Sequence, residues 1–235
     1  MTYSIVARDP ATGYLGVAVA SRFFAVGAAV PYIHSRGAVA TQAFVNPMWG
    51  VEGAARLKAG DSAPDVLADF VARDAGQRQR QAHMIDVNGH IAAHTGTDCV
   101  DWAGHCSAEG VSVAGNMLAG PDVIKDTLAC YLDNPTLPFA ERLLLAMKAG
   151  EDAGGDKRGR QSAALRIHRG QDYSWLDLRS DDHPDPLREL DRLLEVAGER
   201  YLIFAEGFGT RENFSGITDR TEIDRAIAER ARLKG

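Results

Sequence analysis

The sequence predicts an α+β protein in which helices cover antiparallel sheets. Strand-like stretches come in consecutive runs and amphipathic helices follow them in runs, so the two do not alternate one by one. The first two strand-like stretches are separated by a short turn, which permits only antiparallel pairing. The chain has 235 residues, of which 45% are hydrophobic and 25% are charged, as expected for a globular protein.

The beginning of the chain reads as strands. β-compatible segments lie at residues 3–8, 14–21, 25–33 and 38–44. The turn Asp9-Pro10-Ala11-Thr12-Gly13 joins the first two segments and has the residue types of a hairpin loop. If Arg8 pairs with Tyr14, the hairpin places Thr2 opposite Ala20. We therefore expect the polar residues just past that strand to lie beside Thr2.

A second hairpin is predicted in the middle of the chain. Asn88-Gly89 is a dipeptide preferred in two-residue type I′ turns, and it separates the strand-like segments 83–87 and 90–94. In a two-residue loop His83 lies directly opposite His94, with their Cβ atoms about 5 Å apart.

Helical periodicity is found in the rest of the chain. Helices are expected after Ser62, at Pro121, after Thr136, at Asp185-Pro186 and over residues 221–233, and further strands at 111–114, 162–169 and 173–178. No linker is evident before about residue 208. We therefore expect one domain over residues 1–207 and a C-terminal extension with an amphipathic helix over residues 208–235.

Composition excludes several classes of partner. The net charge of −6 argues against a nucleic-acid surface. No apolar run reaches the ~18 residues of a membrane span, and the N-terminus has no secretory pattern. The three cysteines form no Cys-x-x-Cys pair, which favours a reducing, cytoplasmic location. The amphipathic last helix is compatible with assembly into a homo-oligomer.

Thr2 is the first residue with a specific chemical interpretation. Methionine aminopeptidases act when the second residue is small, and removal of Met1 would give Thr2 a free α-amine. That amine has a reference pKa of about 7.7–8.0, so it can accept a proton near neutral pH. A threonine activated by its own amine is a known nucleophile design. The alternative is that Thr2 simply begins a strand.

Five segments of the chain resemble the bacterial family called domain of unknown function 1028. They are TYSIVARD at 2–9, GVAVASR at 16–22, ATQA at 40–43, GNML at 115–118 and GGDKRGRQSAAL at 154–165. The resemblance covers about residues 2–207. That family is grouped with the N-terminal-nucleophile (Ntn) hydrolases, which implies a four-layer αββα sandwich of two antiparallel sheets between helices.

The opening of the chain also resembles proteasome β subunits, with a strand from Thr2, a hairpin and then Val19-Ala20-Ser21-Arg22. Two departures concern the residues that tune the threonine in that family. Ala20 stands where those subunits have Asp, and no Lys occurs between Met1 and Lys58. The tuning groups of the proteasomal threonine are therefore absent or replaced.

The resemblance and the strand ends together define a candidate site. Thr2 is the expected nucleophile, and Asn116, which lies between a strand and a helix start, is the expected oxyanion donor together with nearby backbone N–H groups. The expected substrate-binding residues are Ser21, Arg22, Thr41, Gln42, Asn46 and Arg158. Ordinary turn chemistry is the alternative for Asn46, and a solvated basic loop is the alternative for Arg158.

Three functions are compatible with the sequence. The first is an Ntn-type amidohydrolase acting on a small amide or an amino-acid-like molecule. The second is a non-catalytic protein of the same fold that keeps Met1 and binds a small molecule. The third is a metal-dependent hydrolase in which Cys99, His105 or Cys106 completes a site begun by His83 and His94. Because no standard zinc spacing is present, we expect neither a metal nor another cofactor.

Overall fold

The computed structural model describes residues 2–234 of the chain. It divides into two compact units, Met1–Leu190 and Asp191–Gly235. The division falls within helix α6 (Pro186–Glu199), which begins at the Asp185-Pro186 signal. It lies before residue 208, where the sequence places the C-terminal extension, and that domain boundary stays a prediction.

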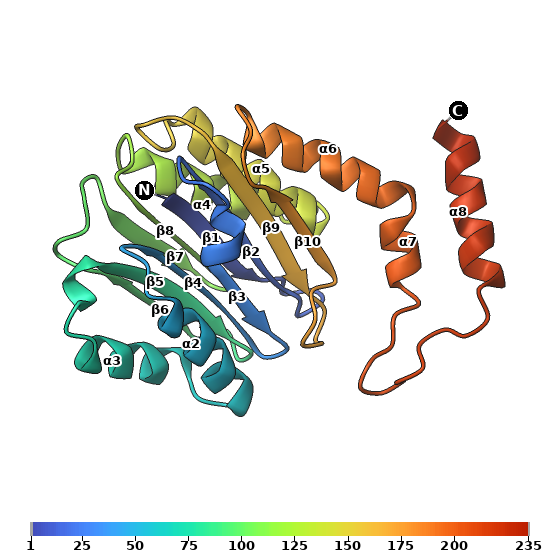
Figure 1. Ribbon diagram of the computed structural model, residues 1–235, viewed down its shortest axis with the longest axis horizontal. Coiled ribbons are helices and arrows are strands. Elements are labelled where there is room, and N and C mark those ends of the chain that lie inside the picture. The colour runs from blue at the N-terminus through green and yellow to red at the C-terminus, as the bar shows by residue number, and fades with distance from the viewer. Residues whose placement is uncertain (1, 235) are drawn as a thin grey trace. The chain divides into compact units, whose positions relative to one another are not determined.

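The first unit contains two antiparallel sheets (Figure 1). The six-stranded sheet has the order β10-β9-β2-β1-β8-β7, and the four-stranded sheet has the order β3-β4-β5-β6. The strands of the first sheet are β1 (Thr2–Arg8), β2 (Leu15–Ser21), β7 (Gly104–Ala108), β8 (Val111–Asn116), β9 (Ser162–His168) and β10 (Leu176–Ser180). Those of the second are β3 (Pro31–His34), β4 (Gly37–Ala43), β5 (Arg80–Asp86) and β6 (Ile91–Thr95).

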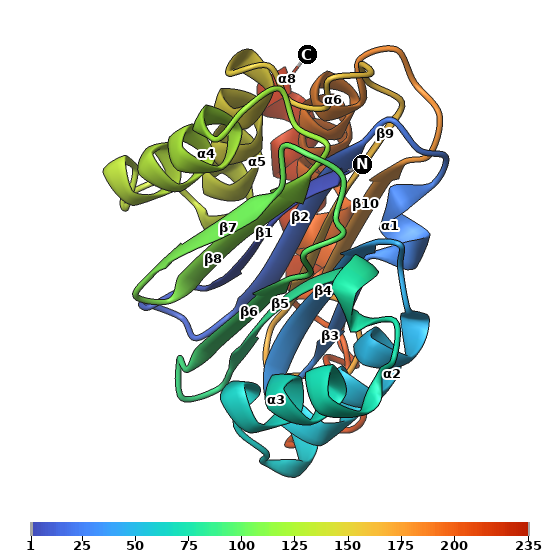
Figure 2. The ribbon, with the colours of Figure 1, turned by 90° about the vertical axis from the view of Figure 1, so that its left-hand side faces the viewer.

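Helices lie on the outer faces of both sheets (Figure 2). Helices α4 (Asp122–Asp133) and α5 (Phe139–Asp152) lie against the six-stranded sheet, and α2 (Pro47–Ala59) and α3 (Ala63–Arg73) lie against the four-stranded sheet. The short helix α1 (Val26–Ala29) contacts β9, and a 3-10 turn, η1 (Gln77–Gln79), precedes β5. The expected mixture of helices and two antiparallel sheets is therefore confirmed.

The second unit contains the rest of α6, then α7 (Tyr201–Ala205) and α8 (Thr221–Lys234). Phe204 and Phe208 pack edge to face, and Ile223 of α8 is buried. The amphipathic helix predicted over residues 221–233 is thus present. Within residues 2–234, no helix has both the length and the apolar character needed to cross a membrane.

Apolar layers on both faces of a sheet follow from the alternation of side chains along the strands. Between the sheets, Val6, Val17 and Ile85 are fully buried in one cluster. On the other face of the four-stranded sheet, Val39 packs with Phe70 in a second cluster beneath α2 and α3. Each large side chain that is removed from water in this way contributes about 1.5–3 kcal/mol.

The β1–β2 hairpin differs by one residue from its predicted register. Arg8 pairs with Leu15 and Tyr3 with Ala20, so the Arg8–Tyr14 pairing was wrong. Asp9 N–H donates to the carbonyl of Tyr14, and Gly13 adopts a left-handed φ of 73° to close the loop. The corrected register brings Thr2 to the level of Ser21 rather than Ala20.

The loop at Asn88-Gly89 joins two paired strands, but it is one residue longer than predicted. Ile85 pairs with Ile91, and Asp86 N–H donates to the carbonyl of His90. The Asp86 carboxylate accepts hydrogen bonds from the backbone N–H groups of Asn88 at 2.8 Å and His90 at 3.0 Å, which stabilises the longer loop.

That extra residue changes the partner of His83, which now lies opposite Ala93. His94 lies opposite Ala82 and belongs to the other face of the sheet, where its ring packs beside Trp49. The predicted His83–His94 pair is therefore wrong.

The segment 25–33, predicted as one strand, is also different. It forms α1 followed by β3, because Ala25 takes a left-handed conformation with φ 53° and begins a helical turn.

Candidate functional site

The ends of three neighbouring strands meet at Thr2. Thr2 pairs with Asn116 of β8, and its Oγ1 lies 3.2 Å from Oγ of Ser21 at the end of β2. All three side chains are buried, with Thr2 6% exposed. Thr2 therefore lies on a central strand with a polar neighbour on each side, which holds its hydroxyl in a fixed position.

The amide of Asn116 is engaged within the protein. Its Nδ2 donates to Oε1 of Gln81 at 2.9 Å and to the carbonyl of Thr2 at 3.4 Å. These two acceptors use both hydrogens of the amide. In this arrangement Asn116 positions the backbone of Thr2, and a role as oxyanion donor requires it to release one acceptor.

Gln81 of β5 connects the two sheets and was missed in the sequence. Its Oε1 accepts hydrogen bonds from Asn116 and from Nε2 of Gln42, the latter at 2.9 Å. Its Nε2 donates to the carbonyl of Gly115 at 2.8 Å. A glutamine within a strand gives no signal by itself, and only the packing of β5 on β8 reveals that it supports Asn116.

A buried histidine continues this polar strip. Nε2 of His83 lies 2.8 Å from Oγ of Ser4, and Nδ1 lies 3.0 Å from Oγ of Ser112. Because the Ser4 hydroxyl donates to Oε1 of Gln42 at 2.8 Å, it accepts the proton of Nε2. Burial, with a smaller effect of His105, lowers the pKa of His83 to about 3, so the ring is neutral.

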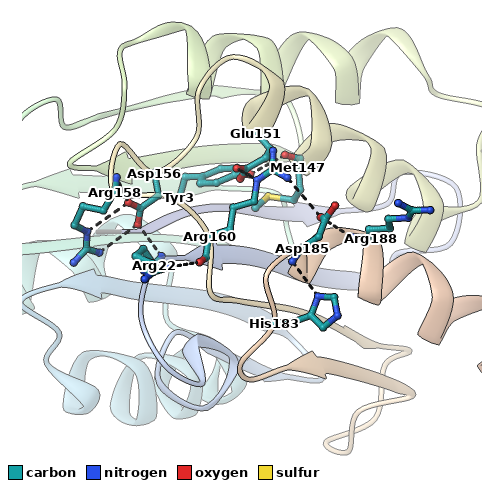
Figure 3. Close-up of polar contacts among 10 residues, drawn as sticks. All are labelled: Tyr3, Arg22, Met147, Glu151, Asp156, Arg158, Arg160, His183, Asp185 and Arg188. Carbon is teal, nitrogen blue, oxygen red and sulfur yellow. Dashed lines mark hydrogen bonds and ion pairs between the residues drawn. The ribbon is translucent and has the colours of Figure 1, made fainter.

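Asp156 ties the loop before β9 to the end of β2 (Figure 3). Its carboxylate, which is almost fully buried, accepts the backbone N–H of Arg22 at 2.7 Å and that of Arg158 at 2.8 Å. The guanidinium of Arg158 also forms an ion pair with Asp156 at 3.3 Å. Arg158, predicted to bind a substrate carboxylate, is thus already paired with an acidic side chain.

A second set of contacts lies on the helix side of β1. The hydroxyl of Tyr3 donates to the carbonyl of Met147 at 2.9 Å and to Oε2 of Glu151 at 3.1 Å. Burial and then the neighbouring Glu151 raise the pKa of Tyr3 well above its usual value. Glu151 also binds Arg160 at 2.5 Å, so this carboxylate links the strand, helix α5 and the loop before β9.

Two predicted site residues lie elsewhere. Thr41 is on the opposite face of β4 from Gln42, and its hydroxyl donates to the carbonyl of Asn46 at 3.4 Å. Asn46 caps helix α2 by accepting the N–H of Met48 at 3.0 Å, and its amide binds Asp74. Asn46 therefore has a structural role as a helix cap, while Gln42 belongs to the polar strip that supports Thr2.

A small pocket lies next to Ser21, with a volume of about 160 Å³. It is lined by Arg22, Arg160, Gln161, Asp182, His183 and Pro184. Gln161 N–H donates to the carbonyl of Ser21 at 3.1 Å, which joins the pocket wall directly to the strand end beside Thr2.

The described residues contain no group of three or more His, Cys, Asp or Glu side chains placed to hold a metal ion. His83 and His94 lie on different faces of the four-stranded sheet, so they cannot form the ligand pair that the metal-dependent hydrolase hypothesis requires.

Comparison with known proteins identifies the family. A family model described as a family of unknown function, DUF1028, matches residues 2–190. The chain belongs to the DUF1028 family. The crystal structure of a DUF1028 protein from Silicibacter pomeroyi is similar, with 30% identity and a TM-score of 0.85 over 93% of this chain and 99% of that one. None of the curated proteins compared with the chain matches it.

The DUF1028 match ends where the first compact unit ends, at residue 190. Every side chain described above as lying around Thr2 falls within this matched region. The DUF1028 portion of the chain therefore carries the candidate site.

Proposed function

We propose that this DUF1028 protein is an Ntn-type amidohydrolase that acts on small amides, with Thr2 as its nucleophile after removal of Met1. The arrangement of helices on both outer faces of two antiparallel sheets supports an Ntn-type architecture. The observation that carries the proposal is the placement of the Thr2 hydroxyl, 3.2 Å from Ser21 and level with Asn116 on a central strand.

The chemistry follows from a free Thr2 residue. Its α-amine takes the proton from Oγ1, and Oγ1 attacks the carbonyl carbon of the amide. The tetrahedral intermediate collapses to an ester on Thr2, and the protonated α-amine gives its proton to the departing amine. Water then attacks the ester with the α-amine as base, which releases a carboxylic acid and restores Thr2.

The neighbours of Thr2 have separate tasks in this scheme. Ser21 orients Oγ1 through the hydroxyl contact, and Asn116 fixes the backbone of Thr2 through its carbonyl. Gln81 holds the Asn116 amide in place at 2.9 Å. Such positioning keeps the nucleophile aligned without further reorganisation during the reaction.

The test combines intact-mass analysis with turnover of an amide library. The expected mass lacks Met1, and Thr2→Ala should lower turnover by about a thousandfold or more, because removing a nucleophile abolishes covalent catalysis. Thr2→Ser keeps a hydroxyl and should stay active. Thr12→Ala, in the exposed β1–β2 loop, is the matched control and should behave as the original protein.

Two outcomes would contradict the proposal. Turnover by protein that keeps Met1 on every molecule excludes amine-assisted attack, because a peptide nitrogen is not basic. Retention of Met1 without turnover of any amide would instead favour the alternative, a non-catalytic small-molecule-binding protein of the same fold.

A further inference from the structure

We propose that the pocket beside Ser21 is a carboxylate-binding site formed by Arg22 and His183. If Thr2 hydrolyses amides, this site makes carboxylate-bearing amides the preferred substrates, and that assignment rests on the proposed function. The binding site itself stands on the side chains that line the pocket. Its volume of about 160 Å³ suits a small head group rather than a large ligand.

The pocket is built from three segments that are tied together by backbone hydrogen bonds. His183 N–H donates to the carbonyl of Gln161 at 2.8 Å, and Gln161 N–H donates to that of Ser21 at 3.1 Å. Ala25 N–H donates to the carbonyl of Asp181 at 3.0 Å. A preformed site of this kind loses little conformational entropy when a ligand binds.

Arg22 supplies the positive charge. Its Nη1 donates to the carbonyl of Arg160 at 2.8 Å, which fixes the guanidinium at the pocket (Figure 3). Within the described residues no carboxylate forms an ion pair with Arg22, whereas Arg158 and Arg160 are paired with Asp156 and Glu151. The remaining N–H groups of Arg22 can therefore bind an anion in the planar geometry that suits a carboxylate.

His183 supplies a second donor. Its Nδ1 accepts the backbone N–H of Asp185 at 3.0 Å, so the neutral ring carries its proton on Nε2. This ring lines the same pocket as Arg22. The pocket wall therefore offers one cationic donor, on Arg22, and one neutral donor, on His183.

The remaining charges of the pocket narrow the ligand class. Asp182 also lines it, and its Oδ1 accepts a hydrogen bond from Nε2 of Gln161 at 3.2 Å. Arg160 is balanced by Glu151 and by Asp185 at 3.7 Å. Arg22 and Asp182 are thus the charged groups of the pocket for which the described residues show no ion pair. With so little net charge in the pocket, a singly charged carboxylate at Arg22 fits better than a phosphate with two charges.

The pocket lies near the strand end that holds Thr2. Gln161 in its wall is bonded to the Ser21 backbone, and the Ser21 hydroxyl contacts Oγ1 of Thr2. Thr2 and Ser21 are buried and do not line the pocket, so an amide whose carboxylate binds Arg22 has to extend past the end of β2 to reach the nucleophile.

The test measures binding by the purified full chain with N-acetylglycine, N-acetylglycinamide and inorganic phosphate as probes. N-acetylglycine should perturb the amide resonances of Arg22, Gln161 and His183, and the other two probes should bind more weakly. Arg22→Gln should weaken N-acetylglycine binding about tenfold or more, because a charge-assisted contact is lost. Arg179→Gln, which removes an equal charge from a guanidinium paired with Asp181 outside the pocket, is the control.

Several results overturn the carboxylate site. They are the absence of binding by N-acetylglycine at millimolar concentration, equal binding of its amide, tighter binding of phosphate, or unchanged binding by a folded Arg22→Gln variant. If the protein shows no amidase turnover but binds N-acetylglycine in a way that depends on Arg22, the carboxylate site is retained and the hydrolase proposal is rejected. Amidase turnover with an unchanged KM in Arg22→Gln keeps the hydrolase and rejects the site.

Discussion

Acidification should destabilise the protein through His83, since this ring is fully buried and neutral between Ser4 and Ser112. Its pKa is lowered from 6.5 to about 3 in the folded chain. Below pH 6.5 the unfolded chain binds a proton at this ring and the folded chain does not. The free energy of unfolding therefore falls as the pH decreases, and this loss continues until the folded pKa is reached.

The magnitude follows from the two pKa values. Each pH unit between them costs about 1.4 kcal/mol, so His83 alone removes about 3 kcal/mol between pH 6.5 and about pH 4. His168 adds a loss of the same sign over this range, since burial lowers its pKa to about 4. Protonation of the Asp and Glu side chains also changes the free energy of unfolding with pH. A variant at His83 is therefore needed to isolate the part that belongs to this residue.

Urea denaturation at several pH values provides the assay. His83→Gln replaces the ring by an amide that still offers a donor and an acceptor to the two serines. Below pH 6.5, the slope of its unfolding free energy against pH should be about 1.4 kcal/mol per pH unit smaller than that of the original protein. His168→Gln should remove a separate part of the slope, and the two effects should add because the residues lie in different sheets. Identical slopes in the original protein and His83→Gln would refute the reasoning.

Two further predictions concern single side chains. Gln81→Leu leaves the amides of Asn116 and Gln42 without their shared acceptor, and it should lower the free energy of unfolding by about 3 kcal/mol or more in urea denaturation. Gln79→Leu, an exposed control, should stay within about 0.5 kcal/mol. Ser62→Ala removes the N-cap that accepts the N–H of Asp65, and it should cost about 1 kcal/mol by the same measurement, with helix content otherwise retained.

The elements that sequence reasoning recovers are those with local signals. Ser62 caps α3, and the Asp185-Pro186 signal begins α6. Helix α2 was missed although Pro47 follows a capping Asn46, because Gly50 and Gly53 lower the helical propensity of its first half. In the structure a Cβ on Gly50 would lie 2.2 Å from the ring of Tyr32, so tertiary packing requires glycine there.

The site was only partly predictable for a related reason. The hairpin predicted from the sequence correctly brought the Ser21 hydroxyl close to Thr2, although its register was wrong by one residue. The edge strand β7 was missed because its side chains are mostly polar or small and only partly covered. Gln81 bonds to Asn116, and His183 shares a pocket with Arg22 and bonds to Gln161, so both residues depend on segments distant in sequence that no local pattern reveals.

The strip of amides between the sheets has a consequence for how the chain avoids misfolding. If one sheet slid over the other, the inward faces of both sheets would stay inward, so burial of apolar side chains alone is a weak criterion for the native alignment. Amide contacts cross between the sheets: Nε2 of Gln42 donates to the carbonyl of Ala114 at 3.2 Å, and Nδ2 of Asn116 donates to Oε1 of Gln81 at 2.9 Å. Each of these contacts is made at one alignment of the sheets only. A shifted pairing would bury several donors without acceptors, and it is therefore rejected by its polar contacts even where its hydrophobic contacts are adequate.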